Sequence, residues 1–423
     1  MKILLLKYIQ DEMRHISGSF DLALFYLKHY GSEYADIDVL YNRYLEKEEF
    51  ISEFRKKIKQ KRYDYIGIVS VNLGTLPDWS LWIRDLVNEA SCPILMGGPL
   101  PSSIPDFAIE KMGAKYVFIG DGEWSFRDFC SGKKINEIPS IYYKGRKECK
   151  LNPVKNLDEL PMYEIPDSLN DQDLYIHYST SRGCSYNCFF CYSKSMWGNL
   201  RRMSPKKVID DILNLKKQST RIKSIYFPDD TFTFDKIWIK DFCDMYIDEK
   251  IDIPFKIMTR IDCVDDEILK MLLEAGCISI AFGINGGSDR ILKLGNRKHH
   301  INIININIDI ISNYEIDELQ FQFIIGFPDE TEEEVIECIN LAKEIKNKIK
   351  KTSKTIVIFG LLSPYPGSPY HLKFHPDYFN NFDISKSFKD QVPNLSKIKN
   401  EKILYYLELG NSIDKMEDFY NIK

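Results

Sequence analysis

Short apolar segments alternate with amphipathic ones along the first third of the chain. This alternation predicts strands separated by helices, and strands that are apolar throughout indicate a parallel sheet covered on both faces. We therefore predict an α/β, doubly wound, Rossmann-like domain over residues 1–138, with helices at 23–31 and 48–62. Its strands are expected at 2–8, 37–42, 65–71, 92–98 and 116–120.

The alternation returns after residues 139–172, a polar stretch with several prolines that indicates an interdomain linker with a hairpin at 140–150. Residues 173–375 predict six strand–helix units, a partial (β/α)6 barrel with its active site at the carboxyl ends of the strands. Strands are expected at 175–181, 224–232, 255–260, 277–286, 318–328 and 355–367, and helices at 204–219, 265–276, 301–312 and 331–347. Residues 376–423, with a helix at 397–415, are expected to form a short helical cap.

Composition and charge exclude several classes of protein. The 423 residues are 44% hydrophobic and carry a formal net charge of -5, so no global basic field indicates a nucleic-acid partner. The apolar run at the N-terminus is interrupted by Lys7 and Asp11, and it is too short for a signal peptide or a membrane span. We expect a cytoplasmic protein without a membrane partner.

Three loops of the first predicted sheet follow strand ends, where such sheets bind ligands. Their sequences are SVNLGT, GGPLPSS and GDGEW, which offer glycine, hydroxyl and amide groups to a bulky polar ligand. The alternative is that these are ordinary turn residues. The first strand is not followed by GxGxxG, and the chain has no GxxxxGK[ST], which counts against a dinucleotide or a nucleotide phosphate.

Ten cysteines are present, and three of them, Cys184, Cys188 and Cys191, lie within eight positions in CSYNCFFC. Clustered thiols in a reducing compartment favour a metal site, whereas the seven scattered cysteines are expected to pack in the core. A zinc site would need a further ligand, and the nearest histidine, His177, is expected to be a packing or rim residue. The CxxxCxxC spacing instead supplies three thiolates to a [4Fe–4S] cluster and leaves one iron free for an exogenous ligand.

The cysteine motif, on a loop after the first strand of a βα series, resembles that of the radical S-adenosylmethionine (SAM) superfamily. Further segments are similar to strand ends of the subgroup with an N-terminal cobalamin-binding domain: RRMSPKKVIDDI, FPDDTF, TRIDCVDDEILKMLLEAGC, FGINGGSDRILK, IIGFPDETEEEV and PYPGSPY. GGPLPSS and GDGEWSF are similar to that subgroup's cobalamin loops. The resemblance covers nearly the whole chain and implies three cofactors, a [4Fe–4S] cluster, SAM and cobalamin.

For SAM, the resemblance implies roles for five residues. Phe190 is expected near the adenine, or else packs in the core. Asp229 or Asp230 is expected near the methionyl amino group. Arg260 is expected near the methionyl carboxylate or the ribose, the alternative being a strand-end salt bridge with Asp262. The chain has GINGGS where relatives usually have GIESGS, so Asn285 offers an uncharged contact instead of an acidic one.

For cobalamin, the resemblance implies contacts from the three loops of the first domain. The implied residues are Gly97, Gly98, Pro99, Ser102, Ser103, Gly120, Gly122 and Glu123. The DxHxxG motif that supplies an axial histidine is absent, which fits the base-off binding typical of this subgroup. Asn72 or Leu73 is then expected at the lower face of the corrin, although Asn72 is alternatively a strand-end cap.

The activity that the resemblance implies is methylation of an unactivated carbon. The 5′-deoxyadenosyl radical abstracts a hydrogen atom and methylcobalamin donates the methyl group. One alternative is a radical cyclase, rearrangement or oxidative enzyme of the same architecture without methyl transfer, and another is a non-catalytic iron–sulfur or cobalamin sensor. The implied partners are a small-molecule or peptide substrate and an electron donor of the flavodoxin or ferredoxin type.

Overall fold

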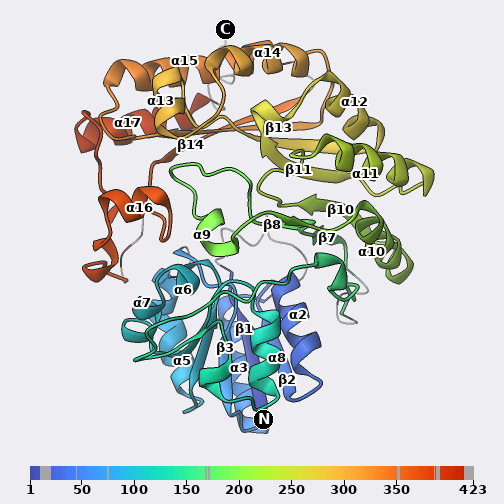
Figure 1. Cartoon of the computed structure of the whole chain (residues 1–423), viewed down its shortest axis with the longest axis vertical. Helices are drawn as coiled ribbons and strands as arrows, with labels where there is room; N and C mark the ends of the chain where they lie inside the picture. Colours follow the sequence, from blue (N-terminus) through green and yellow to red (C-terminus); the bar gives the residue numbers. More distant parts are fainter. Residues whose placement is uncertain are drawn as a thin grey trace.

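The computed structural model describes residues 1–9, 21–43, 45–73, 76–166, 169, 172–349, 353–384, 386 and 391–413. Two large sheets follow one another along the longest axis of the molecule, the first at the N-terminal end and the second at the C-terminal end (Figure 1). The predicted helix at 397–415 extends at its last two residues beyond the described part of the chain.

The first sheet has the strand order β2-β1-β3-β4-β5-β6. Its five parallel strands are β1 (Lys2–Lys7), β2 (Asp36–Tyr41), β3 (Tyr65–Ile68), β4 (Ile94–Gly97) and β5 (Ala114–Phe118). Its helical segments are α2 (Leu22–Gly31), α3 (Lys47–Gln60), α4 (Leu76–Asp78), η2 (Trp79–Ile83), α5 (Arg84–Asn88), α6 (Pro99–Ser103), α7 (Pro105–Glu110) and α8 (Glu123–Cys130). The doubly wound prediction and its five strands are confirmed, and the order changes direction between β1 and β3, where such sheets bind ligands.

The hairpin predicted at 140–150 is wrong. One short strand forms there, β6 (Ile141–Tyr142), and it pairs antiparallel with β5 rather than with a neighbour in the same segment. Ile141 is fully buried among the apolar side chains of the first domain, and this burial holds the strand on the edge of the first sheet. The first sheet therefore extends past residue 138.

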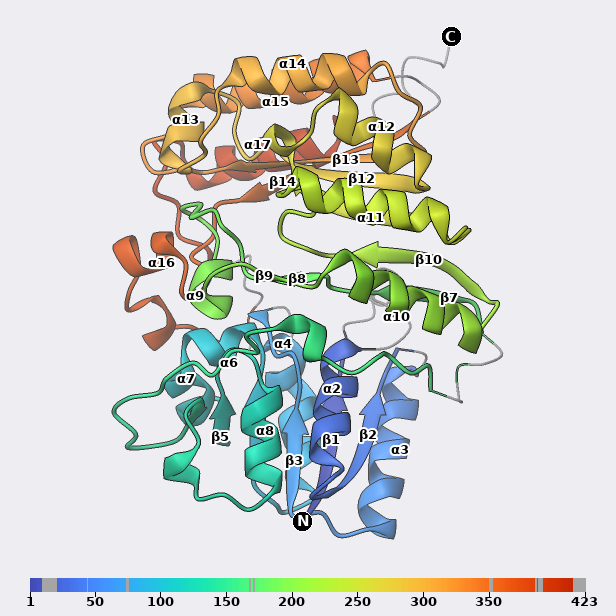
Figure 2. The ribbon, with the colours of Figure 1, turned by 45° about the vertical axis from the view of Figure 1, so that its right-hand side comes forward.

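The second sheet is parallel throughout, with the order β14-β13-β12-β11-β10-β7. Its strands are β7 (Leu174–His177), β10 (Ile222–Phe227), β11 (Phe255–Arg260), β12 (Cys277–Gly283), β13 (Glu318–Ile325) and β14 (Lys354–Leu361). Helices cover its outer face: α10 (Pro205–Gln218), α11 (Lys236–Asp248), α12 (Asp266–Glu274), α13 (Asp289–Leu294), α14 (Ile301–Ile311), α15 (Glu332–Lys348) and α17 (Asn400–Asn411) (Figure 2). The six-unit partial barrel is confirmed, although several strands end earlier than predicted.

Capping side chains fix where the outer helices begin. Ser204 accepts a hydrogen bond from the backbone N–H of Lys207 at the start of α10, and Pro205 occupies the first turn. Thr331 and Glu334 form a reciprocal capping box at the start of α15. Asp235 caps α11, a helix that the sequence analysis did not identify.

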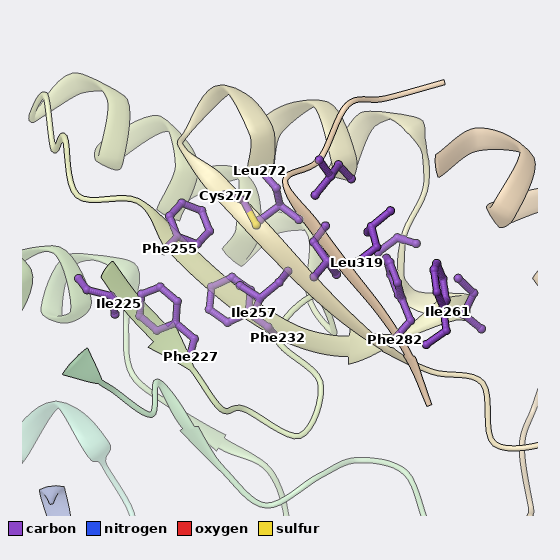
Figure 3. Close-up of a cluster of buried hydrophobic side chains, with 14 of the residues drawn as sticks. Ile225, Phe227, Phe232, Phe255, Ile257, Ile261, Leu272, Cys277, Phe282 and Leu319 are labelled. Carbon is purple, nitrogen blue, oxygen red and sulfur yellow. The ribbon is translucent and has the colours of Figure 1, made fainter. Parts of the chain in front are cut away.

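The main core lies between the second sheet and these helices. Its apolar side chains come from successive strands and from the loop after β10, as Figure 3 shows for Ile225, Phe227, Phe232, Phe255, Ile257 and Phe282. Trp238 and Phe242 of α11 stack with their ring centroids 5.3 Å apart and close one side of this core. Burial on this scale makes the second sheet a rigid frame for the loops at its carboxyl edge.

Residues after the barrel connect the two sheets. The segment contains α16 (Pro369–Phe374) and η7 (Tyr378–Asn380), and it returns toward the first domain before α17 packs on β14. Phe379 and Phe382 form edge contacts with Phe107 of α7. In the described residues, no helix is long and apolar enough to cross a membrane.

Candidate active site

A cavity of about 460 Å³ lies at the carboxyl edge of the first sheet and opens toward the second. It is bounded by Leu5 of β1, Val69 after β3, Gly97 of β4 and Phe118 of β5. The loop that carries Cys184, Cys188 and Cys191 is called the cysteine loop. The opposite wall of the cavity comes from the segments on both sides of these cysteines and from the end of β10. The residues of that wall are Ser179, Ser181, Arg182, Gly183, Tyr192, Met196, Trp197, Met203, Pro228 and Asp230.

The cavity brings together most of the residues predicted from the loops of the first domain. Those that line it are Asn72, Gly97, Gly98, Pro99, Gly120, Gly122 and Glu123. Three others lie elsewhere. Leu73 is buried in the core of the first domain, and Ser102 accepts a hydrogen bond from the backbone N–H of Gly120 at 3.0 Å. The hydroxyl of Ser103 is buried without a hydrogen-bond partner.

Gly98 shows why glycine follows β4. Its φ is +122°, and a Cβ at this position would lie 2.4 Å from the backbone nitrogen of Val71. The next residues begin α6, so the loop turns sharply where it lines the cavity. A side chain here would push two strand-end loops apart and change the shape of the cavity.

A buried ion network closes the cavity between the two sheets. Arg182, two residues before Cys184, lies 2.6 Å from Glu123 and 3.1 Å from Asp121. Arg201 lies 2.5 Å from the same Asp121. Burial disfavours the charge of Arg182, but the carboxylates of Glu123 and Asp121 hold the pKa of Arg182 above its ordinary value. No local sequence pattern indicates this network, because its paired residues lie 59 to 80 positions apart.

The three clustered cysteines lie on the loop after β7, between β8 (Ser181–Arg182) and α9 (Ser193–Trp197). Cys188 is buried, whereas Cys184 and Cys191 are partly exposed, and all three are free thiols. The backbone N–H of Ser193 points at the sulfur of Cys191 at 3.4 Å. Burial is the main cause that raises the pKa of Cys191 to about 12, with smaller contributions from Asp230, Cys188 and Cys184.

Two buried guanidinium groups point at the sulfur of Cys188. Nη1 of Arg260 lies 3.5 Å from it and Nη1 of Arg297 lies 3.6 Å from it. Arg260 is also bidentate to Asp262, at 2.9 and 2.7 Å, so the strand-end salt bridge considered from the sequence does form. His299 lies 3.1 Å from Asp262. Arg297 and His299 were missed from the sequence, where the segment GNRKHH gives no metal-ligand spacing.

The N–H groups around Cys188 and Cys191 fit cysteine sulfurs that bind an iron–sulfur cluster. Two N–H groups directed at one ligand sulfur, and a third directed at another, are the donors that stabilise cluster thiolates. Nε of Arg297 and Nε2 of His299 are buried without hydrogen-bond partners. In the described residues, no three His, Cys, Asp or Glu side chains converge on a single metal ion. A cluster does not require such a group, because each thiolate binds a different iron.

Asp229 and Asp230 occupy different environments. Asp229 is buried and accepts hydrogen bonds from the hydroxyl of Thr180, at 3.0 Å, and from that of Ser181. These hydrogen bonds connect the end of β10 to the segment that leads into the cysteine loop. Asp229 is not among the residues that line the cavity. Asp230 lines the cavity and accepts a hydrogen bond from Ser193. Burial raises the pKa of both carboxyl groups.

Phe190 and Asn285 lie outside the cavity lining. Phe190 makes an edge contact with Phe327, with ring centroids 6.4 Å apart, as its packing alternative predicts. Asn285 follows β12 with φ +67°, a left-handed conformation that asparagine tolerates better than most residues. Its side chain therefore sits at a backbone position that favours asparagine or glycine.

Comparisons with known proteins agree with this arrangement. Residues 178–342 match the model of the Radical SAM superfamily. An uncharacterized methyltransferase of Pyrococcus horikoshii is 28% identical over 400 residues, which cover 87% of this chain and 82% of the relative.

Two solved structures are similar across both sheets. The radical SAM methyltransferase TsrM of Kitasatospora setae, with cobalamin and a [4Fe-4S] cluster bound, has a TM-score of 0.73 at 15% identity, covering 89% of this chain and 75% of that chain. The cobalamin-dependent SAM radical enzyme OxsB, with aqua-cobalamin and SAM bound, has a TM-score of 0.69 at 19% identity, covering 94% of this chain and 58% of that chain. Residues 178–342 are therefore similar to the Radical SAM superfamily, and the chain as a whole shares the two-part fold of TsrM and OxsB.

Proposed function

We propose that the protein is a cobalamin-dependent radical SAM methyltransferase that acts on an unactivated carbon. The observation that carries the proposal is that one cavity joins the strand-end loops of the first sheet to Ser181, Arg182 and Gly183, which lead into the cysteine loop. A ligand held by the first domain would therefore face the cysteine loop. The methyltransferase name of the Pyrococcus horikoshii relative and the methyltransferase TsrM support methyl transfer.

In this proposal Cys184, Cys188 and Cys191 hold a [4Fe–4S] cluster. When bound, the cofactors supply one electron to cleave SAM, a 5′-deoxyadenosyl radical and a methyl group on cobalt. The protein buries the sulfur of Cys188 away from water and offsets the charge of that sulfur with Arg260 and Arg297. The backbone N–H of Ser193 contributes a further donor at Cys191.

SAM binding is assigned to residues at the carboxyl ends of the second sheet. Asp230 is the acidic candidate for the methionyl amino group because it lines the cavity, whereas Asp229 holds Thr180 and Ser181. Arg260 remains the candidate for the methionyl carboxylate or ribose. Phe190 is assigned to the adenine and Asn285 to an uncharged polar contact.

Cobalamin binding is assigned to the cavity wall of the first domain. Gly97, Gly98 and Gly120 allow backbone to approach a bulky ligand, and Gly122 and Pro99 complete the same edge. Glu123 keeps one buried carboxylate oxygen without a hydrogen-bond partner while the other receives Arg182, so it is a candidate acceptor for an amide of the ligand. Asn72 is the lower-face candidate, whereas burial of Leu73 argues against that residue.

The remaining assignments concern partners. We propose a flavodoxin-type or ferredoxin-type electron donor, because cleavage of SAM consumes one electron that no other group of the chain provides in this scheme. The substrate is assigned to a small molecule or a peptide. Residues Tyr192 and Tyr365, whose rings lie 6.0 Å apart beside the cavity wall, are candidates for its contacts.

The test uses anaerobic protein with cluster and hydroxocobalamin, an excess of reductant, and SAM carrying a trideuterated methyl group. We expect S-adenosylhomocysteine, trideuteromethylcobalamin and 5′-deoxyadenosine, measured by mass spectrometry. The Cys191→Ala variant should lose 5′-deoxyadenosine, whereas Cys149→Ala, a partly exposed thiol of the linker, should keep it. 5′-Deoxyadenosine without labelled cobalamin would contradict methyl transfer, and the absence of both products would contradict an enzyme.

A further inference from the structure

The surface nearest to the cysteine loop carries three exposed lysines, one of which, Lys373, lies over the ring of Phe374. The loop lies between α13 and α16, as two views of the molecule show (Figures 1 and 2). Hydrogen bonds fix this placement: Phe189 donates to the carbonyl of Gly295 at 3.0 Å, and its own carbonyl accepts from Tyr370 at 2.8 Å. Whatever contacts α13 and α16 from solvent therefore also approaches the cysteine loop.

This surface, the loop face, contains three exposed lysines and three exposed apolar side chains. They are Lys293, Lys298, Lys373, Leu294, Leu372 and Phe374. None of the three lysines forms an ion pair with a residue that the structure describes. An apolar patch surrounded by unpaired charge of one sign is a typical surface for transient protein association.

Two carboxylates close to this surface offset part of this charge. Asp289 of α13 accepts a hydrogen bond from the backbone N–H of Ile301 and lies 3.5 Å from His300. Asp377 accepts from the side chain of Asn380. The three lysines outnumber Asp289 and Asp377 by one formal charge, so the loop face is locally positive although the protein as a whole has a formal net charge of -5.

The loop face also provides a short route to the cysteines. Asn187 is exposed, and Cys188, the next residue, is buried against the two guanidinium groups. The side chain of Asn296 donates to the carbonyl of Asn187 at 2.6 Å and holds this exposed residue against the end of α13. One residue of backbone thus separates solvent at the loop face from a proposed cluster ligand.

From these observations we infer that the loop face is the docking site of an acidic one-electron carrier protein. The inference rests on the proposed function, because it assigns the electron donor of the same site. One electron passes from the reduced carrier to the oxidised cluster, the carrier leaves with one electron fewer, and no bond or proton is exchanged. The lysines attract and orient the carrier, and the apolar side chains give the short-lived complex its contact area.

The test measures how fast reduced flavodoxin, an acidic flavin carrier, reduces the reconstituted holoenzyme by stopped flow at low and high ionic strength. The triple variant Lys293→Glu, Lys298→Glu and Lys373→Glu should lower the second-order rate constant at low salt at least tenfold and abolish its salt dependence. Lys373→Glu alone should give an intermediate rate. Excess dithionite should still reduce the cluster of each variant to the same extent.

A matched control changes three exposed lysines of the first domain by the same charge, Lys111→Glu, Lys115→Glu and Lys147→Glu. Its rate constant should stay near that of the parent, and an equal fall in both variants would assign the effect to net charge and overturn the inference. A parent-like rate in the loop-face variant would also overturn it, as would a dimer that this variant dissociates, since the surface would then belong to a second copy. A parent protein without any cluster would instead contradict the proposed function.

Discussion

Arg182 donates to Glu123 across the boundary between the two sheets, with Nη2 and Oε1 2.6 Å apart. Glu123 opens α8 of the first domain, whereas Arg182 lies two residues before the first clustered cysteine. Glu123 is buried, Arg182 exposes only 14% of its side chain, and both line the cavity. The pair therefore fixes the cysteine loop relative to the wall assigned to cobalamin, and its removal should affect both.

Replacement of Arg182 by methionine should destabilise the protein by roughly 3 to 5 kcal/mol, because Glu123 would remain buried without its ion-pair partner and Asp121 would keep only Arg201. Urea unfolding measures this loss. The control is Arg221→Met, which removes a pair with Asp173 in which both side chains are about half exposed, at 50% and 47%. This control should cost about 1 kcal/mol or less, and equal losses would contradict a special role for the buried pair.

Replacement of Arg297 by methionine should make the cluster harder to reduce. A cationic N–H donor to a ligand sulfur stabilises the reduced cluster, so its loss lowers the reduction potential. At a fixed applied potential, we expect the ratio of reduced to oxidised cluster to fall about tenfold. This change corresponds to a reduction potential lower by roughly 59 mV for a one-electron couple.

A redox titration followed by electron paramagnetic resonance measures this shift without an activity assay. Arg290→Met serves as the control, since Arg290 pairs with Glu334 on the surface and makes no contact with the cysteines. An unchanged potential in the Arg297 variant, with full cluster content, would contradict the assigned role of this guanidinium.

Gly98→Ala should destabilise the first domain by at least about 3 kcal/mol and weaken retention of hydroxocobalamin. The added Cβ would meet the backbone of Val71 and Ser70 at 2.4 to 2.8 Å, at a φ of +122°. Gly113→Ala is the control for backbone strain without a steric clash. The φ of Gly113 is also positive, at +81°, but no atom lies within 4 Å of the added Cβ. This control should cost about 1 to 2 kcal/mol and leave cobalamin retention unchanged.

Glu330 should make the protein less stable as the pH rises. The residue is buried after β13 and accepts hydrogen bonds from the backbone N–H groups of Gly326 and Phe327, and burial raises its pKa to about 7. The folded state then keeps a proton that the unfolded state releases near pH 4.5, so stability is lost between these pH values, by up to about 3 kcal/mol.

Glu330→Gln should flatten this dependence, because the amide retains an acceptor oxygen but never ionises. Urea unfolding at pH 5 and pH 8 measures the difference between variant and parent. Glu318→Gln is the control of opposite sign: burial favours a higher pKa for Glu318, but its ion pair with Lys354 holds the pKa below its ordinary value. Over this pH range the control should keep the slope of the parent, and a parent-like slope in Glu330→Gln would contradict the assignment.

Much of the framework follows from local sequence patterns. Apolar runs identify the five strands of the first domain and the six of the second, and the spacing of Cys184, Cys188 and Cys191 identifies the candidate cluster site. The strand-end loops predict most of the cavity wall because parallel strands bring their carboxyl ends to one edge. Helix α11 was not identified from its segment, KIWIKDFCDMYID, although its charged residues recur at helical spacing.

The other missed features depend on contacts between distant segments. Arg297 reaches the sulfur of Cys188 from 109 positions away, and Arg182 reaches Glu123 from 59 positions away. Neither pair leaves a local signal. The different roles of Asp229 and Asp230 depend on which carboxylate turns toward Thr180, and identical neighbouring residues cannot reveal this in sequence.

The most direct test of the account is the cofactor content of anaerobically purified protein after reconstitution with iron, sulfide and hydroxocobalamin and removal of unbound ligand. The parent protein should retain stoichiometric cobalamin and show the absorption of a [4Fe–4S] cluster. The triple variant with Cys184, Cys188 and Cys191 changed to alanine should retain cobalamin but lose the cluster, because the proposed sites of the two cofactors lie on different sheets. A parent protein that holds a cluster without retaining cobalamin would contradict the cobalamin-dependent mechanism.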